Sequence, residues 1–141
     1  MIILFRGQTR RFGEKVRATD GFPLPSNFVY GGLFPANDGQ DFAIIYQQEP
    51  DIKKFAVYAD TVGQYINRED IHGVKIFDGD ILKVRSNTGK EYLRRVFFDA
   101  HSSSFVLMSR NSNIHHFTPG EIYEVVGNIY DDADMFMNSK G

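Results

Sequence analysis

The sequence contains no cysteine and no tryptophan in its 141 residues, and only five prolines. Without cysteine, the chain cannot form disulfides, thiolate nucleophiles, iron–sulfur clusters or zinc sites with sulfur ligands. No apolar run exceeds five residues. A bilayer span needs about 20 apolar residues and a secretory leader about 7–15, so neither is predicted. We therefore expect a cytoplasmic protein with no membrane partner.

Charge is balanced overall but distributed in blocks. The 16 basic and 18 acidic residues give a formal net charge of −2. Residues 1–19 and 83–95 each hold five basic residues against one acidic residue, whereas residues 20–52 and 121–134 each hold five acidic residues and no basic one. Two interpretations stay open: pairing of the blocks within the fold or between copies, or a basic face that contacts phosphate.

Hydrophobic residues recur mostly with a period of two, which is typical of strands. The pattern predicts strands over residues 2–5, 28–34, 42–47, 55–58, 81–85, 91–98, 105–108 and 122–130, with one helical turn over 133–137. In 81–85 we expect Leu82 and Val84 inside and the two basic residues outside. In 91–98 one side is expected to carry Tyr92, Arg94, Val96 and Phe98. The loop 10–27 contains Pro23 and Pro25, which cannot donate to a central ladder.

These elements predict a mostly β protein with few or short helices. Short strands at close spacing suggest a small barrel in the C-terminal half, with additional strands in the N-terminal half. We expect a single domain over 1–141, with an irregular β-rich part over 1–60 and a barrel part over 61–141.

Two segments form a distinctive central motif, Thr61-Val62-Gly63-Gln64-Tyr65 and, twelve residues later, Phe77-Asp78-Gly79-Asp80-Ile81. The chain here reads TVGQYINREDIHGVKIFDGDIL, which resembles the pattern TVGQYTGLxDxxGxxIxEGDIV of the YopX family. Three further segments are similar to that family, in the same order: Leu4–Gly7, Val29–Leu33 and Glu124–Tyr130. The resemblance implies a small β-rich protein with an SH3-like barrel, encoded in phages and prophages, and it assigns no catalytic residue.

The chain departs from the family pattern at three places. Ile66 and Asn67 replace the usual TG, and Asp70-Ile71-His72-Gly73 stands where an acidic-Asn-Gly turn is usual. Residues 8–27 are longer than the common spacing, which we interpret as an insertion of open role.

The motif residues are interpreted as mainly structural: Thr61, Val62, Gly63, Gln64, Tyr65, Gly73, Gly79, Asp80, Gly127 and Asn128. Glycines suit tight turns because they tolerate positive φ. Asp78 and Asp80 fit turn capping, although carboxylates two residues apart can also share a hard cation. Thr61, Gln64 and Tyr65 either brace a turn or line a groove.

Metal and catalytic chemistry find little support. A mixed site is conceivable if the strands over 91–98 and 105–117 pair, from Asp99, His101, His115 or His116, and Glu121. Adjacent histidines on a strand point to opposite faces, so His115 and His116 cannot both bind one ion. The alternative is that these side chains are solvated or packed. Nucleotide-binding glycine loops and serine-nucleophile motifs are absent from the sequence. We assign no cofactor, no metal and no catalytic residue.

A nucleic-acid interface is the second functional hypothesis. Small barrels bind single strands with a basic groove and aromatic platforms. The candidate residues lie on the predicted strands over 81–98: Lys83, Arg85, Tyr92, Arg94 and Arg95. Phe97 and Phe98 interleave with them, and Arg6, Arg10 and Arg11 could extend the patch. The pI of about 6.1 is far below the value above about 9 that is typical of such proteins.

The sequence therefore favours a non-catalytic binding module for a protein partner or for its own copies. Nucleic-acid binding through strands 81–98 is the alternative, and a metal-dependent enzyme is a weaker one.

Overall fold

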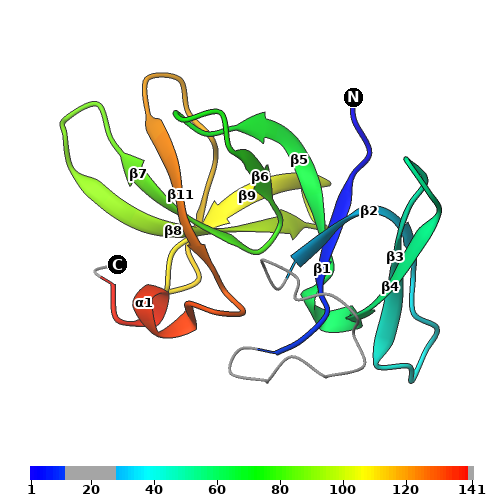
Figure 1. Cartoon of the computed structure of the whole chain (residues 1–141). Helices are drawn as coiled ribbons and strands as arrows, with labels where there is room; N and C mark the ends of the chain where they lie inside the picture. The colour runs from blue at the N-terminus through cyan, green and yellow to red at the C-terminus, as the bar shows by residue number, and fades with distance from the viewer. Residues whose placement is uncertain (12–27, 140–141) are drawn as a thin grey trace. The chain divides into compact units, whose positions relative to one another are not determined.

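The structure is a computed structural model that describes residues 1–11 and 28–139. Backbone contacts divide the chain into two compact units, Met1–Gln64 and Tyr65–Gly141, and their elements are labelled in Figure 1. Strands dominate the described residues, and the one α-helix among them is the five-residue α1, Ala133–Met137. The prediction of a mostly β chain with few or short helices is confirmed. No helix in the described ranges has the length and apolarity to cross a bilayer.

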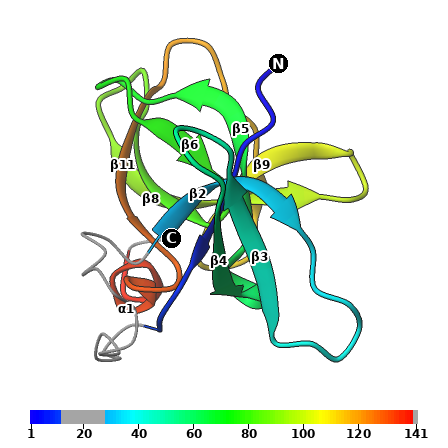
Figure 2. The ribbon, with the colours of Figure 1, turned by 45° about the vertical axis from the view of Figure 1, so that its right-hand side comes forward.

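The first unit contains four antiparallel strands in the order β4-β3-β2-β1. Their bounds are Phe5–Gln8 for β1, Phe28–Phe34 for β2, Phe42–Gln47 for β3 and Lys53–Tyr58 for β4. Figures 1 and 2 both show β3 and β4 side by side. A short 3-10 turn, Ala59–Thr61, leads to β5, Gly63–Glu69, whose first two residues pair with β1.

The strand predictions hold for β2 and β3, whereas β4 begins two residues earlier than expected. The first strand is wrong by three residues. The apolar run from Met1 favoured a strand over 2–5, but the ladder with β2 begins at Phe5, and Ile2 and Ile3 are exposed. Apolar residues alone do not define a strand, because its bounds depend on where a partner supplies hydrogen bonds. Most of the predicted insertion over 8–27, including Pro23 and Pro25, lies outside the described residues.

The second unit contains a five-stranded antiparallel sheet in the order β10-β9-β8-β7-β11. The bounds are Asp80–Arg85 for β7, Glu91–Asp99 for β8, Ser104–Met108 for β9, Ile114–His115 for β10 and Ile122–Asn128 for β11. The later part of β5 pairs with β6, Lys75–Phe77. In the five-stranded sheet, β10 and β11 are edge strands, so this sheet is not a closed barrel. The SH3-like arrangement and the division into parts 1–60 and 61–141 stay predictions.

Each unit has its own hydrophobic core. In unit 1 the fully buried members are Val29, Ala43, Ile45 and Val57. In unit 2 they are Ile76, Leu82, Val84, Val96, Leu107 and Tyr123. The predicted inner residues of 81–85 are therefore buried, and the basic residues between them point to the other side of the sheet. The expected shared side of Tyr92, Arg94, Val96 and Phe98 is the core side, because Tyr92 lies opposite Val84 and Arg94 opposite Leu82.

Two adjacent glycines allow β2 to change partner. Residues 28–31 of β2 pair with β1, and residues 32–34 pair with β3. A Cβ on Gly31 would collide with the carbonyl oxygen of Tyr46, and a Cβ on Gly32 would collide with the Tyr46 ring. Only glycine permits both close approaches at this crossing.

The two glycines provide a test of this packing. We expect Gly31→Ala to lower the free energy of unfolding by about 1–3 kcal/mol, because overpacking against a backbone oxygen forces the ladder apart. Gly32→Ala should cost less, because a half-buried tyrosine ring can rotate away. Urea denaturation of both variants measures the difference. If both variants lose the same free energy of unfolding, the backbone oxygen of Tyr46 is not the contact that limits the packing here.

Candidate functional site

The outward face of the unit 1 sheet is built from aromatic side chains. Along β3, buried Ala43 and Ile45 alternate with residues that point to the opposite side of the sheet. The strand register places Phe34 of β2 beside Ile44, and Tyr58 of β4 beside Phe42. We define the aromatic face as the large apolar and aromatic side chains on this side of the sheet: Tyr30, Phe34, Phe42, Ile44, Tyr46 and Tyr58. Lys54 of β4 lies on the same side, opposite Tyr46, and is exposed.

Much of the aromatic face is accessible. The exposed fractions are 41% for Tyr30, 53% for Phe34, 45% for Phe42 and 37% for Ile44. The rings pack in pairs, with centroids 4.8 Å apart for Phe34–Tyr46 and 4.9 Å apart for Phe42–Tyr58. These contacts order the rings without burying them. Apolar side chains gathered on one surface mark interaction sites in globular proteins, whereas scattered ones do not.

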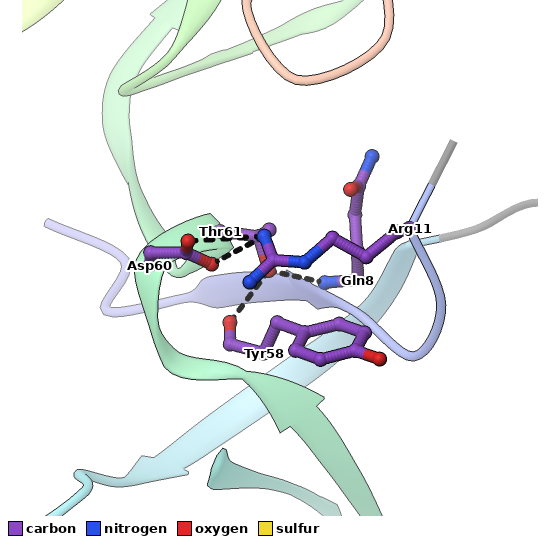
Figure 3. A network of polar contacts seen from close by, with 5 residues as sticks. All are labelled: Gln8, Arg11, Tyr58, Asp60 and Thr61. Atoms are coloured by element: carbon purple, nitrogen blue, oxygen red, sulfur yellow. Dashed lines mark hydrogen bonds and ion pairs between the residues drawn. The ribbon is translucent and has the colours of Figure 1, made fainter. Parts of the chain in front are cut away.

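Arg11 lies against one end of the aromatic face. The carbon at the centre of its guanidinium is 4.1 Å from the centroid of the Tyr58 ring. Its Nη1 donates to both carboxylate oxygens of Asp60, at 2.8 and 3.0 Å, as Figure 3 shows. An aromatic ring and a neighbouring carboxylate thus hold one guanidinium together, by cation–π attraction and a charge-assisted hydrogen bond.

The same network fixes the turn that carries Asp60. The Thr61 side chain is fully buried; its Oγ1 accepts from the backbone N–H of Gln8 at 2.8 Å and donates to the carbonyl of Tyr58 at 2.6 Å (Figure 3). Thr61 therefore ties the end of β1 to the turn after β4. This geometry fits the turn-bracing interpretation of Thr61.

Acidic loops flank the aromatic face at both ends. Asp38 and Asp41 lie in the loop between β2 and β3, and Glu49 and Asp51 lie in the loop between β3 and β4. All four are exposed, and within the described residues none has an ion pair or a side-chain hydrogen bond. Residues 28–52 contain no basic residue. Lys53 and Lys54, however, begin β4 directly after the second loop and are exposed. The β2–β3 loop therefore gives its end of the face a negative potential, whereas the two lysines offset Glu49 and Asp51 at the other end.

The residues predicted to bind nucleic acid lie on both sides of the unit 2 sheet. Lys83, Arg85 and Arg95 share one side, and Tyr92 and Arg94 share the core side. Lys83 Nζ is 3.4 Å from a carboxylate oxygen of Glu124 and 3.8 Å from one of Glu91, and Arg85 Nη2 is 3.2 Å from the other oxygen of Glu91. Acidic neighbours on adjacent strands thus compensate the outward charges of β7.

Arg94 is buried, although arginine is rarely placed inside. Its guanidinium lies 4.8 Å from the Tyr92 ring centroid and Nη1 donates to the carbonyl of Leu93 at 2.9 Å. Burial lowers the pKa of Arg94, and the nearby Tyr92 and Glu121 oppose that shift. The structure thus brings Tyr92 and Arg94 together, and Lys83 with Arg85, but it does not bring all five residues to one surface. Of the residues proposed to extend the patch, Arg6 is buried with its guanidinium 4.2 Å from the Phe28 ring centroid.

The candidate metal ligands serve other roles in the structure. Strands β8 and β9 pair as that hypothesis requires, but no group of three or more histidine or acidic side chains in residues 1–11 and 28–139 could hold an ion. The hydroxyl of Ser102 donates to Asp99 at 2.8 Å, and this hydrogen bond lowers the pKa of the Asp99 carboxyl. Glu121 accepts from the Tyr123 hydroxyl at 3.0 Å. Burial and the charge of Arg94 lower the pKa of His115.

Four motif residues lie where β7 begins and β11 ends: Gly79, Asp80, Gly127 and Asn128. Gly73 and Gly79 have φ of +78° and +94°, as their predicted turns require, whereas Gly63 is extended and lies opposite Arg6. Asp80 is buried, and its carboxylate accepts from the backbone N–H of Phe77 at 2.8 Å, which caps the turn. Asn128 lies opposite Asp80 across the ladder.

The Asn128 side chain holds the turn after β11. Its carbonyl oxygen accepts from the backbone N–H groups of Tyr130 and Asp131, at 3.0 and 2.9 Å. Asp132 in turn accepts from the backbone N–H of Asn128 at 3.0 Å, and a Cβ on Gly127 would collide with that carboxylate. The motif residues of this corner therefore make turn contacts.

A family model described as YopX protein matches residues 31–136. The chain belongs to the YopX family. The match covers both units and includes the central motif and the closing Glu124–Tyr130 segment, whereas Leu4–Gly7 lies outside it. No curated protein matches the chain.

Asp70, the acidic residue of the turn that ends at Gly73, is a central polar residue of unit 2. One carboxylate oxygen accepts from the backbone N–H groups of His72 and Val74, at 2.8 and 2.9 Å, and the other accepts from that of Val125 at 2.9 Å. Ile71 also donates to the carbonyl of Tyr123 at 2.9 Å. The turn therefore occupies hydrogen-bonding groups on the open edge of β11.

Burial raises the pKa of the Asp70 carboxyl, but the hydrogen bonds from Val125, Val74 and His72, with the charge of His72, outweigh it and lower the pKa below its usual value. Sequence reasoning noted this turn but not the role of its carboxylate. The available signal was an acidic residue three positions before a glycine. Sequence reasoning also missed the aromatic face. The available signal was the recurrence of large apolar residues at even-numbered positions, namely Phe28, Tyr30, Phe34, Phe42, Ile44 and Tyr46.

We expect Asp70→Asn to lower the free energy of unfolding by about 1.5–3 kcal/mol at neutral pH, because the hydrogen bonds lose their charged acceptor and an amide N–H2 faces one of the donors. Because the pKa of the Asp70 carboxyl is lowered on folding, its ionised form stabilises the folded state. This stabilisation is complete above the unfolded pKa of about 3.9 and is lost as the pH falls through the folded pKa. The wild-type protein should therefore lose more stability on acidification than the variant.

Urea denaturation between neutral and acidic pH measures both effects. Asp134→Asn is the control, because Asp134 is exposed in the first turn of α1. It should change neither the free energy of unfolding at neutral pH nor the loss of that free energy on acidification appreciably. If Asp70→Asn and wild type lose the same free energy of unfolding on acidification, the Asp70 carboxylate does not anchor this turn.

Proposed function

We propose that this YopX protein is a non-catalytic binding module whose aromatic face binds a protein partner. The single observation that carries this proposal is the group of four exposed, large apolar side chains on one side of the unit 1 sheet. Their rings are ordered by mutual packing, so binding a partner there would cost little side-chain entropy. A second copy of the chain is one such partner.

The contacts around the basic residues weigh against nucleic acid as the partner. Lys83 and Arg85 already lie close to carboxylates, and Arg94 is buried. The aromatic face has the exposed rings that base stacking needs, but Asp38 and Asp41 lie in the loop next to Phe34 and Phe42, and their carboxylates would repel phosphate. A protein partner fits this combination of apolar surface and neighbouring carboxylates better.

The family resemblance supports two further parts of the proposal. It supports a phage or prophage origin. It also supports an SH3-like arrangement in unit 2, where three successive strands, β7, β8 and β9, pair as hairpins and β11 returns beside β7. Action in the cytoplasm is instead proposed from the sequence, in which no apolar run is long enough to span a bilayer.

The test replaces two rings of the face by polar side chains. Phe34→Ser/Phe42→Ser should abolish a complex that wild type forms, because it removes most of the exposed aromatic area while leaving the core residues intact. Affinity capture from a lysate of the host cell, and light scattering of the purified protein at high concentration, measure partner binding and self-association respectively. Circular dichroism confirms that the variant folds.

Phe98→Ser is the matched control, because Phe98 is equally exposed, at 48%, but lies on β8 of unit 2. It should retain the complex. If wild type, control and double variant capture the same proteins and scatter light alike, the proposal is wrong. If wild type instead binds single-stranded DNA with a steep salt dependence that Lys83→Ala/Arg85→Ala removes, the nucleic-acid hypothesis replaces it.

A further inference from the structure

The chemistry of the partner can be inferred from the way the aromatic face binds one of the chain's own arginines. The Arg11 guanidinium lies 4.1 Å from the centroid of the Tyr58 ring and is hydrogen-bonded to Asp60. One ring and one carboxylate thus contact the same guanidinium (Figure 3). An arginine side chain of a partner can be recognised by the same two kinds of group.

The end of the face beside the β2–β3 loop repeats the same two ingredients. Phe34 and Phe42 have exposed rings, and Asp38 and Asp41 lie in the loop that joins their two strands. Neither carboxylate has an ion pair or a side-chain hydrogen bond within the described residues. The other end differs, because Lys54 lies opposite Tyr46 and Arg6 lies opposite Tyr30. Exposed rings and carboxylates without an ion pair therefore lie in adjoining segments at the β2–β3 end.

We infer that the aromatic face binds a cationic, arginine-bearing segment of a partner protein, with guanidinium groups stacked on the rings of Phe34 and Phe42 and paired with Asp38 and Asp41. This inference rests on the proposed function and adds the charge and side-chain type of the partner. Arginine fits better than lysine because its planar group stacks on rings while its N–H groups reach a carboxylate. The apolar parts of the segment would contact Ile44.

The probe is a fluorescein-labelled dodecapeptide with four repeats of Arg-Leu-Ser, compared with the same peptide carrying citrulline in place of arginine. Citrulline keeps the length and planarity of the side chain but has no charge. At about 0.15 M salt, fluorescence anisotropy should show that wild type binds the arginine peptide about tenfold more tightly than the citrulline peptide. Equal affinities, or no binding of the arginine peptide, would overturn the inference.

Charge variants locate the site. Asp38→Asn/Asp41→Asn should weaken binding of the arginine peptide about three- to tenfold, which is the range for two exposed ion pairs. The control Glu69→Gln/Asp134→Asn removes the same number of exposed charges from unit 2 and should change the affinity by less than about twofold. If the control weakens binding as much as the test variant, the attraction is general and the inference is wrong.

Removing Arg11 tests the guanidinium site itself. Arg11→Ala should strengthen binding of the arginine peptide about threefold, because the Asp60 carboxylate loses its ion pair with Arg11 and can pair with the peptide instead. Arg10→Ala removes the same charge next to it and should give a smaller change. Equal gains in both variants, or no gain in Arg11→Ala, would overturn the assignment of Tyr58 and Asp60 as an arginine site.

The outcomes separate this inference from the proposed function. If the arginine peptide fails to bind but Phe34→Ser/Phe42→Ser still abolishes a protein complex, the face binds a partner of other chemistry and only the inference falls. If the peptide binds wild type and Phe34→Ser/Phe42→Ser equally, the face is not the site, and the inference falls whatever the lysate experiment shows.

Discussion

Alternation along antiparallel strands is the constraint on which both units depend. Each unit has a single small core, and a strand sends successive side chains to opposite sides of its sheet. Every strand that contributes to a core therefore presents a second set of side chains elsewhere. In unit 2 that second set on β7 includes Lys83 and Arg85, which are compensated by Glu91 and Glu124 on the neighbouring strands. In unit 1 this second set of side chains is largely aromatic, and the rings of Phe34 and Phe42 remain exposed.

Buried polar groups fix the turns that keep this alternation in register. A one-residue slip would exchange the two sides of a strand, so register needs anchors besides the apolar core. Asp70, Asp80 and Asn128 provide them in unit 2, since each side chain accepts hydrogen bonds from backbone N–H groups of a turn. Thr61 does the same in unit 1. The residues of the central motif are therefore concentrated at turns. The aromatic face, which is the surface best suited to binding, is built from other segments of the sequence.

The extent to which the sequence predicted the molecule follows from the same constraint. Polar–apolar alternation in 81–85 indicated both the strand and its inner side, because only one side could be buried. In 42–46 both sides are apolar, so the pattern indicated a strand but not which residues would be outside. Arg94 shows the opposite difficulty: its charge suggested a surface position, but its long apolar stem and the adjacent Tyr92 ring allow it to lie on the core side. The hydrogen bonds of Asp70 to Val125 join residues far apart in the chain, which no local pattern reveals.

The position of Arg11 gives the aromatic face a chemical identity beyond its hydrophobicity. An apolar face alone would favour any hydrophobic partner, including a second copy of the chain. The carboxylates of Asp38 and Asp41 change that preference, because an uncharged partner would have to desolvate them without return, whereas a cationic one would pair with them. The Arg11 site shows that ring and carboxylate act on one guanidinium at the same time, and that a half-exposed site suffices for it. Specificity on this face would then arise from the spacing between the rings and these two carboxylates, which the β2–β3 connection determines.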